Sequence, residues 1–205
     1  MTQWVENPTG GRDRGPVAVL RAWAEILVRP RRFFAAGVAP GDQAPGLVFA
    51  AAVLLLEEGS RFAVVRLAER GLVSTGPFAY PAVSEFSPGI ALLALLGVII
   101  FVMPATVHLT AALQTLLLVP VAEDRGGVSE TVQVMCYAMA PCVLAGLPFP
   151  ELRVVVAAWG AALYIVGTTV VHDVSLGKAL VVGAVPAAIV FGYGFRGFLA
   201  LSVLV

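Results

Sequence analysis

One uninterrupted apolar stretch constrains the fold of this chain more than any other feature. Residues 89–119 contain no aspartate, glutamate, lysine or arginine. A helix needs roughly 20 apolar residues to cross a bilayer, so this stretch can cross one if it tilts or bends at Pro104. Only 13% of the residues of the whole chain are charged, whereas a soluble domain carries about 25%. The composition therefore predicts an all-α, polytopic membrane protein.

Four further apolar stretches bring the predicted number of transmembrane helices to five. Loops that are charged or rich in proline and glycine separate them. Pro141 and Pro186 lie inside two of the stretches and should interrupt their helices. Residues 45–205 are thus expected to form one bundle of five transmembrane helices. The predicted spans are residues 45–67, 89–119, 131–147, 152–171 and 179–204.

The residues before the first span, 1–44, are predicted to form a cytoplasmic N-terminal segment. Residues 1–15 are polar and glycine-rich and show no periodicity, which predicts disorder. Between about residues 16–36 the apolar residues recur at helical spacing, and Pro30 should end or bend this helix. The pattern favours an amphipathic helix in the membrane interface. The alternative is a helix packed on the cytoplasmic end of the bundle.

The two sides of that helix predict contact with the membrane surface. Leu20 and Leu27 share an apolar stripe with Trp23, an aromatic residue typical of the headgroup level. Basic side chains on the other stripe would lie at the headgroups, where each gains roughly 1 kcal/mol from an anionic surface. The expected partners are therefore the lipid bilayer and its anionic lipids. The residues expected at the surface are Arg21, Trp23, Arg29 and Arg32.

The distribution of arginine predicts how the chain is oriented in a cell membrane. Six arginines lie between residues 12 and 32, whereas the loop after the first span begins with Arg66 and Arg70. Segments rich in basic residues stay in the cytoplasm. This rule predicts a cytoplasmic N-terminus, and five spans then place the C-terminus outside.

The first predicted span contains three charged residues, Glu57, Glu58 and Arg61. A charge near the centre of a bilayer costs about 2.5 kcal/mol or more, so these side chains should find partners inside the bundle. Arg61 follows Glu57 by four residues and Glu58 by three, so one carboxylate can pair with it along the helix. The other carboxylate needs a proton or a partner from another helix.

Depth in the bilayer predicts which residues join these charges. At about 1.5 Å per residue, the two glutamates lie roughly 16–20 Å from the cytoplasmic end of their span, and His108 lies at roughly 18 Å on the next span. Tyrosines on the third and fourth spans fall about one turn shallower. The cluster would either hold the helices in register or bind a proton, an ion or a lipid headgroup. Its predicted members are Glu57, Glu58, Arg61, His108, Tyr137 and Tyr164.

Short motifs along the chain carry a resemblance to a known family. Residues 126–131 read Gly-Gly-Val-Ser-Glu-Thr, residues 137–141 read Tyr-Ala-Met-Ala-Pro, and residues 26–34 read Ile-Leu-Val-Arg-Pro-Arg-Arg-Phe-Phe. These segments resemble those of prokaryotic proteins of the Yip1 domain family. The resemblance implies a five-span membrane protein with a cytoplasmic N-terminal region. Eukaryotic members are associated with vesicle traffic and small GTPases, but the chain lacks their Asp-Leu-Tyr-Gly-Pro motif.

Motifs for other functional classes are missing from the sequence. It has no glycine-rich nucleotide loop, no metal-ligand spacing of histidine and cysteine, and no serine-nucleophile motif. A net charge of zero gives no basic surface for nucleic acid. We therefore expect no enzyme activity and no cofactor or metal.

Two classes of function remain. The first is a structural or scaffold protein that organises the membrane or partner proteins, and the resemblance favours this class. The alternative is a transporter or channel for a small solute, an ion or a lipid, which would use the intramembrane polar cluster. Five spans without an internal repeat are unusual for a monomeric carrier, so this alternative favours a homo-oligomer.

Overall fold

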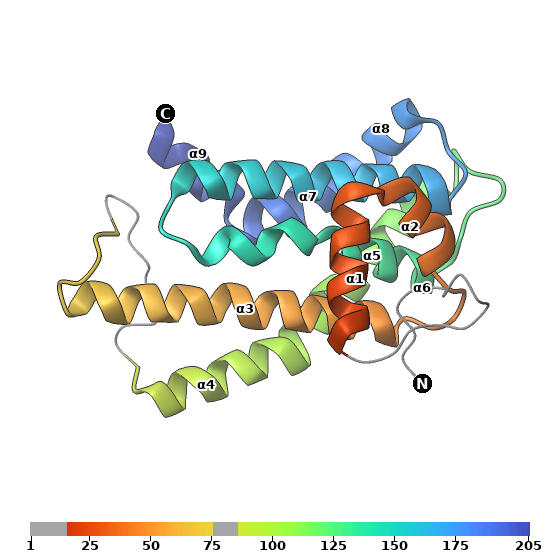
Figure 1. The fold of residues 1–205 in the computed structure, drawn as a ribbon. Helices are drawn as coiled ribbons and strands as arrows, with labels where there is room; N and C mark the ends of the chain where they lie inside the picture. The colour runs from red at the N-terminus through yellow and green to blue at the C-terminus, as the bar shows by residue number, and fades with distance from the viewer. Residues whose placement is uncertain (1–15, 76–85) are drawn as a thin grey trace.

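A computed structural model describes residues 16–75 and 86–205, which form helices and connecting loops and no β-strand (Figure 1). The all-α class predicted from composition is confirmed. Residues 1–15, for which disorder is predicted, lie outside the described residues, as do residues 76–85 of the predicted external loop.

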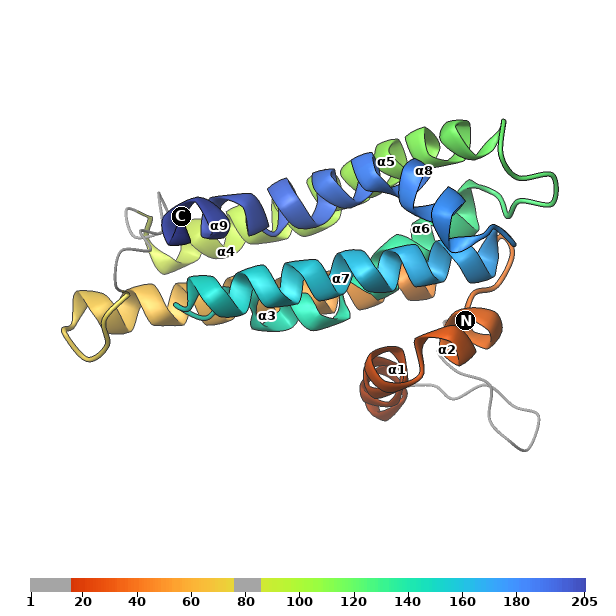
Figure 2. The same cartoon turned by 90° about the horizontal axis from the view of Figure 1, so that it is seen from above.

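Helical rods lie side by side along the long axis of the molecule, and successive rods run in opposite directions (Figure 2). The beginning of the first rod and the C-terminus of the chain consequently lie at opposite ends of the bundle. The rods, in chain order, are α3 (Ala44–Glu69); α4 (Pro88–Gly97) with η1 (Val98–Val102) and α5 (Met103–Leu118); α6 (Val128–Ala138) with η2 (Ala140–Gly146); α7 (Pro150–Val171); and α8 (Leu176–Ala187) with η3 (Ala188–Gly194) and α9 (Gly197–Leu204).

Among the described residues, three helical segments are long and apolar enough to cross a membrane: Pro88–Leu118, Pro150–Val171 and Leu176–Gly194. The α6–η2 pair is a fourth candidate if its two parts, bent by 46°, count as one span. At 26 residues α3 is longer than two of these spans, but every 18-residue stretch of it contains the same three charged residues. The described residues thus hold three or four apolar spans, and the charges of α3 decide whether five are counted.

Proline residues change the hydrogen-bond pattern of three rods. Because Pro104 has no N–H, the segment before it is the π-helix η1, in which the Met103 N–H donates to the Val98 carbonyl. A second π-helix, η3, follows Pro186, and near Pro141 α6 gives way to the 3-10 helix η2. The predicted interruption at Pro141 is present, whereas Pro104 and Pro186 each lie beside a π-helix within a continuous rod, so the interruption predicted at Pro186 is not observed.

Several glycines, Gly146 and Gly160 among them, let the rods approach more closely than a residue with a Cβ atom would allow. A Cβ atom at Gly146 in η2 would overlap the Glu57 carbonyl oxygen and Ser60 Oγ of α3. A Cβ atom at Gly160 of α7 would lie 2.5 Å from the Phe191 ring. Such contacts at small residues are common between membrane helices. The backbone of η2 therefore packs directly on the middle of α3, beside its charged residues.

The N-terminal helices lie across the rods rather than along them (Figure 1). α1 (Pro16–Val28) and α2 (Pro30–Gly37) are separated at Arg29, as expected from the proline that follows. Together they form a layer on the bundle, which we call the N-terminal layer. It is attached through buried side chains, as in the packed alternative considered above. These side chains are Ala18, Ala22, Ile26, Phe33 and Phe34.

Candidate functional site

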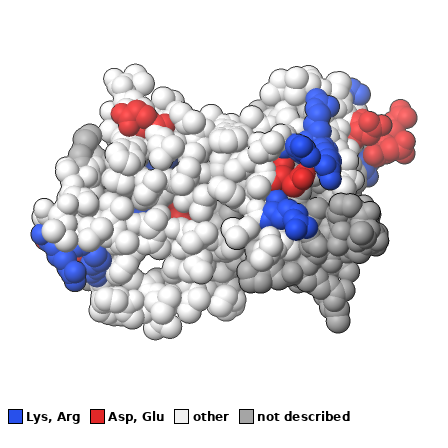
Figure 3. Space-filling view, in the orientation of Figure 1, with Lys and Arg blue, Asp and Glu red and all other residues white. Residues whose placement is uncertain are grey.

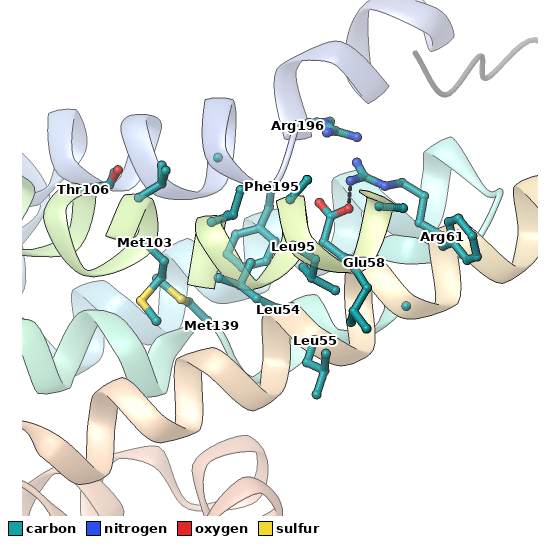
Figure 4. A pocket seen from close by; sticks show the side chains of 18 of the residues that line it. Leu54, Leu55, Glu58, Arg61, Leu95, Met103, Thr106, Met139, Phe195 and Arg196 are labelled. Atoms are coloured by element: carbon teal, nitrogen blue, oxygen red, sulfur yellow. Dashed lines mark ion pairs between the residues drawn. The ribbon is translucent and has the colours of Figure 1, made fainter. Parts of the chain in front are cut away.

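A cavity of about 640 Å³ lies between α3, the α4–η1–α5 rod and the η3–α9 segment (Figure 4). Most of its lining residues are apolar, and both π-helices contribute to it, with Val98 and Val102 from η1 and Val190 from η3. π-Helical segments frequently occur at functional sites. The volume falls within the roughly 300–1,000 Å³ that small-molecule sites occupy. The cavity is therefore the leading candidate for a functional site.

The two ends of the cavity differ in chemistry. At one end, Glu58 and Arg61 lie one helical turn apart on α3 and form an ion pair, as their spacing predicts (Figure 4). Arg196 lines the same end, whereas Met103 and Met139 lie at the other. The cavity thus combines an apolar body with a charged end.

Arg61 has hydrogen-bonding capacity that the ion pair does not use. Its side chain is 4% exposed, and its Nη2 contacts a carboxylate oxygen of Glu58. Its Nε and Nη1 are buried and have no hydrogen-bond partner. A buried donor without a partner costs about 1–3 kcal/mol. The Arg61 guanidinium can therefore bind a further oxygen atom, and an anionic one most strongly.

Glu57 neighbours this pair in sequence but is paired differently. It is buried in α3, and its strongest electrostatic partner is Arg153, followed by Arg196. Arg153 lies near the start of α7, is 1% exposed, and donates a hydrogen bond to the Ala145 carbonyl of η2. Arg153 is not among the site residues predicted from the sequence. Its position inside the apolar stretch 152–171 is the signal that could have identified it.

The structure does not bring His108 to these charges. His108 Nδ1 donates to the Pro104 carbonyl at 2.6 Å, and its Nε2 lies 3.1 Å from Gln43 Oε1. Gln43 precedes Glu57 by fourteen residues, which corresponds to about 21 Å along a helix. His108 therefore lies at the beginning of α3, and the single cluster expected from depth does not form.

The two tyrosines of the expected cluster belong to the aromatic core. Tyr137 packs edge-on against the rings of Phe33 and Phe49, with centroids 4.9 Å and 5.5 Å away. The Tyr164 centroid lies 6.5 Å from that of Phe191. Both tyrosines are fully buried and neither lines the cavity. Their visible contribution is to the packing of the bundle.

A second polar set lies toward the end of the bundle where α3 begins. Gln133 Nε2 donates to the Ala39 carbonyl at 2.7 Å, and its Oε1 accepts from the Ala39 N–H at 3.0 Å. His172 Nε2 lies 3.3 Å from Thr131 Oγ1. Burial lowers the pKa of His172 from 6.5 to about 4, and the charge of Arg125 acts in the same direction. At neutral pH this set is uncharged: Gln133 ties the α2–α3 linker to α6, and His172 ties the end of α7 to α6.

The side chains expected at the membrane surface lie on the N-terminal layer. Trp23 donates its indole N–H to the Ala140 carbonyl at 2.7 Å, so its polar atom faces the bundle. Leu20 is 66% exposed. The expected stripe is therefore divided, with Leu20 turned outward and Trp23 turned inward. The exposed basic residues of the layer are Arg21, Arg29, Arg31 and Arg32.

Basic side chains gather at two places on the visible face of the molecule. Figure 3 shows one group over α1 and α2 and another at the far end of α3, with a largely uncharged surface between them. The second group includes Arg66, which pairs with Glu69 at 2.9 Å. A wide uncharged band is what a surface in contact with lipid chains requires. Within the described residues, no group of histidine, cysteine, aspartate or glutamate side chains could hold a metal ion.

Comparison with known proteins gives one match. No curated protein matches the chain, and no solved structure does. The family model of the Yip1 domain matches residues 24–195, which run from the middle of α1 to the end of η3. This family is one of membrane proteins and is not known for enzymes. Because the match covers well over half of the 205 residues, the chain belongs to the Yip1 domain family.

Proposed function

We propose that the chain is a five-span integral membrane protein with a structural role, which organises lipids or partner proteins at the N-terminal layer. The observation that carries this proposal is the firm attachment of that layer to the bundle. Ile26 is 0% exposed, Phe34 is 1% exposed, and Trp23 is hydrogen-bonded to the bundle. A layer held in this way presents its basic side chains in fixed positions. We expect no catalytic role.

The dimensions of α3 support counting it as the fifth span. Its 26 residues extend about 39 Å at 1.5 Å per residue, more than the roughly 30 Å of the hydrocarbon core. Glu57 and Arg61 are both buried. Charged side chains turned into a bundle are the kind that membranes tolerate. The bundle interior thus keeps these charged side chains away from the lipid, so they do not prevent α3 from crossing the membrane.

The positions of the arginines support a cytoplasmic N-terminus and an external C-terminus in the cell membrane. The N-terminal layer carries four exposed arginines, whereas the far end of α3 carries Arg66 and Arg70. Protease-accessible tags at the two ends of the full chain test this topology. Tags that are cut from the same side of the membrane would contradict five spans.

The outer face of α1 supports contact with the cytoplasmic membrane surface. Val17, Leu20 and Val28 are 69%, 66% and 75% exposed, and Arg21 and Arg29 lie beside them. A helix with apolar and basic residues on its outer face is suited to the boundary between headgroups and acyl chains. Anionic lipids are the partners that its charge favours.

Reversing the charge of the N-terminal layer tests the structural role. The double variant Arg29→Glu with Arg32→Glu changes exposed side chains, so stability should stay within about 0.5 kcal/mol of the wild type. A labelling enzyme fused to the N-terminus records neighbouring proteins in cells, and this set should shrink in the double variant. Arg70→Glu, at the other end of α3, is the matched control. An unchanged set in the double variant would contradict the proposal.

Transport is the second candidate function, and the cavity is the observation that favours it. The cavity lies between two rods that each contain a π-helix, and π-helical segments are frequent at functional sites. Purified protein in liposomes should show no proton, ion or lipid flux above protein-free liposomes if the role is structural. Flux that Glu58→Gln, a change in the cavity lining, abolishes would replace the structural role with transport.

A further inference from the structure

The charges around the cavity do not balance. Glu58, Arg61 and Arg196 line one end of it, and Glu57 interacts with Arg196 and with the buried Arg153. Among the described residues that line the cavity, two arginines against one glutamate leave one net positive charge. An uncompensated charge inside a membrane-embedded bundle is costly. The group therefore has a place for one anion.

The position of the unused hydrogen-bond donors shows where the anion would lie. Arg61 is buried, and two of its nitrogen atoms lack partners after the ion pair with Glu58 is formed. Arg196 lines the same end from the junction of η3 and α9, where its φ of 58° places it in the left-handed region. Two guanidinium groups at one end provide the planar donors that bind phosphate oxygens well.

The remainder of the cavity is suited to a hydrocarbon chain. From the charged end it extends past Leu54 and Leu95 to Met103 and Met139 (Figure 4). One wall is α4, which has no buried residue, so a chain can reach the cavity beside this helix from the lipid phase. Thioether side chains are flexible and adapt to irregular apolar ligands.

The depth of the charged end also fits a lipid. Arg61 lies eight residues before the end of α3, which is about 12 Å along the helix. Met103 lies close to the middle of the Pro88–Leu118 rod. A ligand with its head at Arg61 would thus have its chain directed toward the middle of the bilayer, as the chains of membrane lipids are. A soluble anion would have no use for the apolar part.

We propose that the cavity binds one anionic phospholipid, with its phosphate at Arg61 and Arg196 and an acyl chain directed toward Met103. This inference goes beyond the structural role proposed above and does not depend on it. A bound lipid would neutralise the charge group and fill the space between α4 and the bundle.

Native mass spectrometry of the full chain in mild detergent tests the proposal. Phosphatidylglycerol and phosphatidylcholine with identical acyl chains are titrated separately, and inorganic phosphate is added in a third arm. We expect one phosphatidylglycerol to bind about tenfold or more tightly than phosphatidylcholine, and phosphate at the same concentration not to displace it. Equal binding of the two lipids, or displacement by phosphate alone, would overturn the proposal.

Two variants locate the binding site. Arg61→Gln should reduce the preference for phosphatidylglycerol to near unity, and the exposed Arg70→Gln, at the same end of α3, should retain it. Leu95→Trp places a ring in the apolar part, so it should lower the binding of both lipids while all the arginines remain. If Arg61→Gln fails to fold, Leu95→Trp still decides, because undiminished lipid binding in that variant would place the lipid outside the cavity.

Discussion

Gly146 offers the sharpest test of how α3 is held in the bundle. In Gly146→Ala the new Cβ atom would occupy the space of the Glu57 carbonyl oxygen and Ser60 Oγ. The Ser60 hydroxyl donates to that same carbonyl at 2.8 Å. The carbonyl belongs to the backbone of α3, so relief requires the whole helix to move. Overpacking of this kind costs about 1–3 kcal/mol.

The neighbouring residue places the expected loss at the upper end of that range. Ala145 precedes Gly146 in η2 and accepts the hydrogen bond from the buried Arg153. A shift of η2 displaces the Ala145 carbonyl relative to Arg153, and bonds to charged donors contribute about 1.5–3 kcal/mol. We therefore expect Gly146→Ala to lose about 3 kcal/mol. For a chain of this size, each kcal/mol lowers Tm by about 2–4 °C.

The matched control is Gly59→Ala on the same helix. A Cβ atom at Gly59 would meet nothing within 4 Å. Alanine favours the helix over glycine by about 1 kcal/mol, so Tm should stay constant or rise. Tm is followed by tryptophan fluorescence for both variants in one detergent. A Gly146→Ala protein as stable as the wild type, or equal losses in both variants, would refute the close contact between η2 and α3.

Three further expectations concern the second polar set and the N-terminal layer. The unfolded chain protonates His172 near pH 6.5, whereas the folded chain does so only near pH 4. The neutral ring therefore stabilises the folded state fully above pH 6.5. This contribution, up to roughly 3 kcal/mol, is lost as the pH falls toward 4. Melting curves at pH 7.5 and 4.5 should therefore show a smaller drop for His172→Gln than for the wild type, and equal drops would contradict this. Trp23→Phe removes the hydrogen bond to the Ala140 carbonyl at a cost of about 1 kcal/mol, so limited proteolysis should cut α1 faster than in the wild type, and an unchanged rate would show that the bond does not hold the layer. Gln133→Leu leaves the Ala39 N–H and carbonyl without their partner, so Tm should fall by an amount equivalent to about 1–3 kcal/mol, and an unchanged Tm would mean that solvent replaces the side chain.

Features that depend on neighbours in sequence could be predicted from the sequence. The interruption at Pro141 follows from a missing N–H and acts within one or two turns. The pair of Glu58 and Arg61 follows from a spacing of three residues along one helix. Each of these predictions needed only the local geometry of a helix and no knowledge of the other rods.

The members of the charged site could not be predicted in this way, because they depend on how the rods are offset along the bundle axis. The cluster was predicted from depth in the bilayer, on the assumption that the cytoplasmic ends of α3 and α5 lie in the same plane. The contact between His108 and Gln43 instead aligns the middle of α5 with the start of α3, so the last ten residues of α5 extend about 15 Å beyond it. The position of α7 along α3 is likewise not fixed by sequence, and it brings Arg153, near the start of α7, within electrostatic range of Glu57.

The adjacent glutamates of α3 show why one span can serve two purposes. Consecutive residues of an α-helix point about 100° apart, so Glu57 and Glu58 face different neighbours. Glu57 is buried and interacts with Arg153, on the side where η2 packs without room for a Cβ atom. Glu58 is partly exposed and lies with Arg61 at the cavity. The first contact fixes α3 to the bundle, and this rigid attachment leaves the second pair on a surface that can accept a ligand without unfolding the span that carries it.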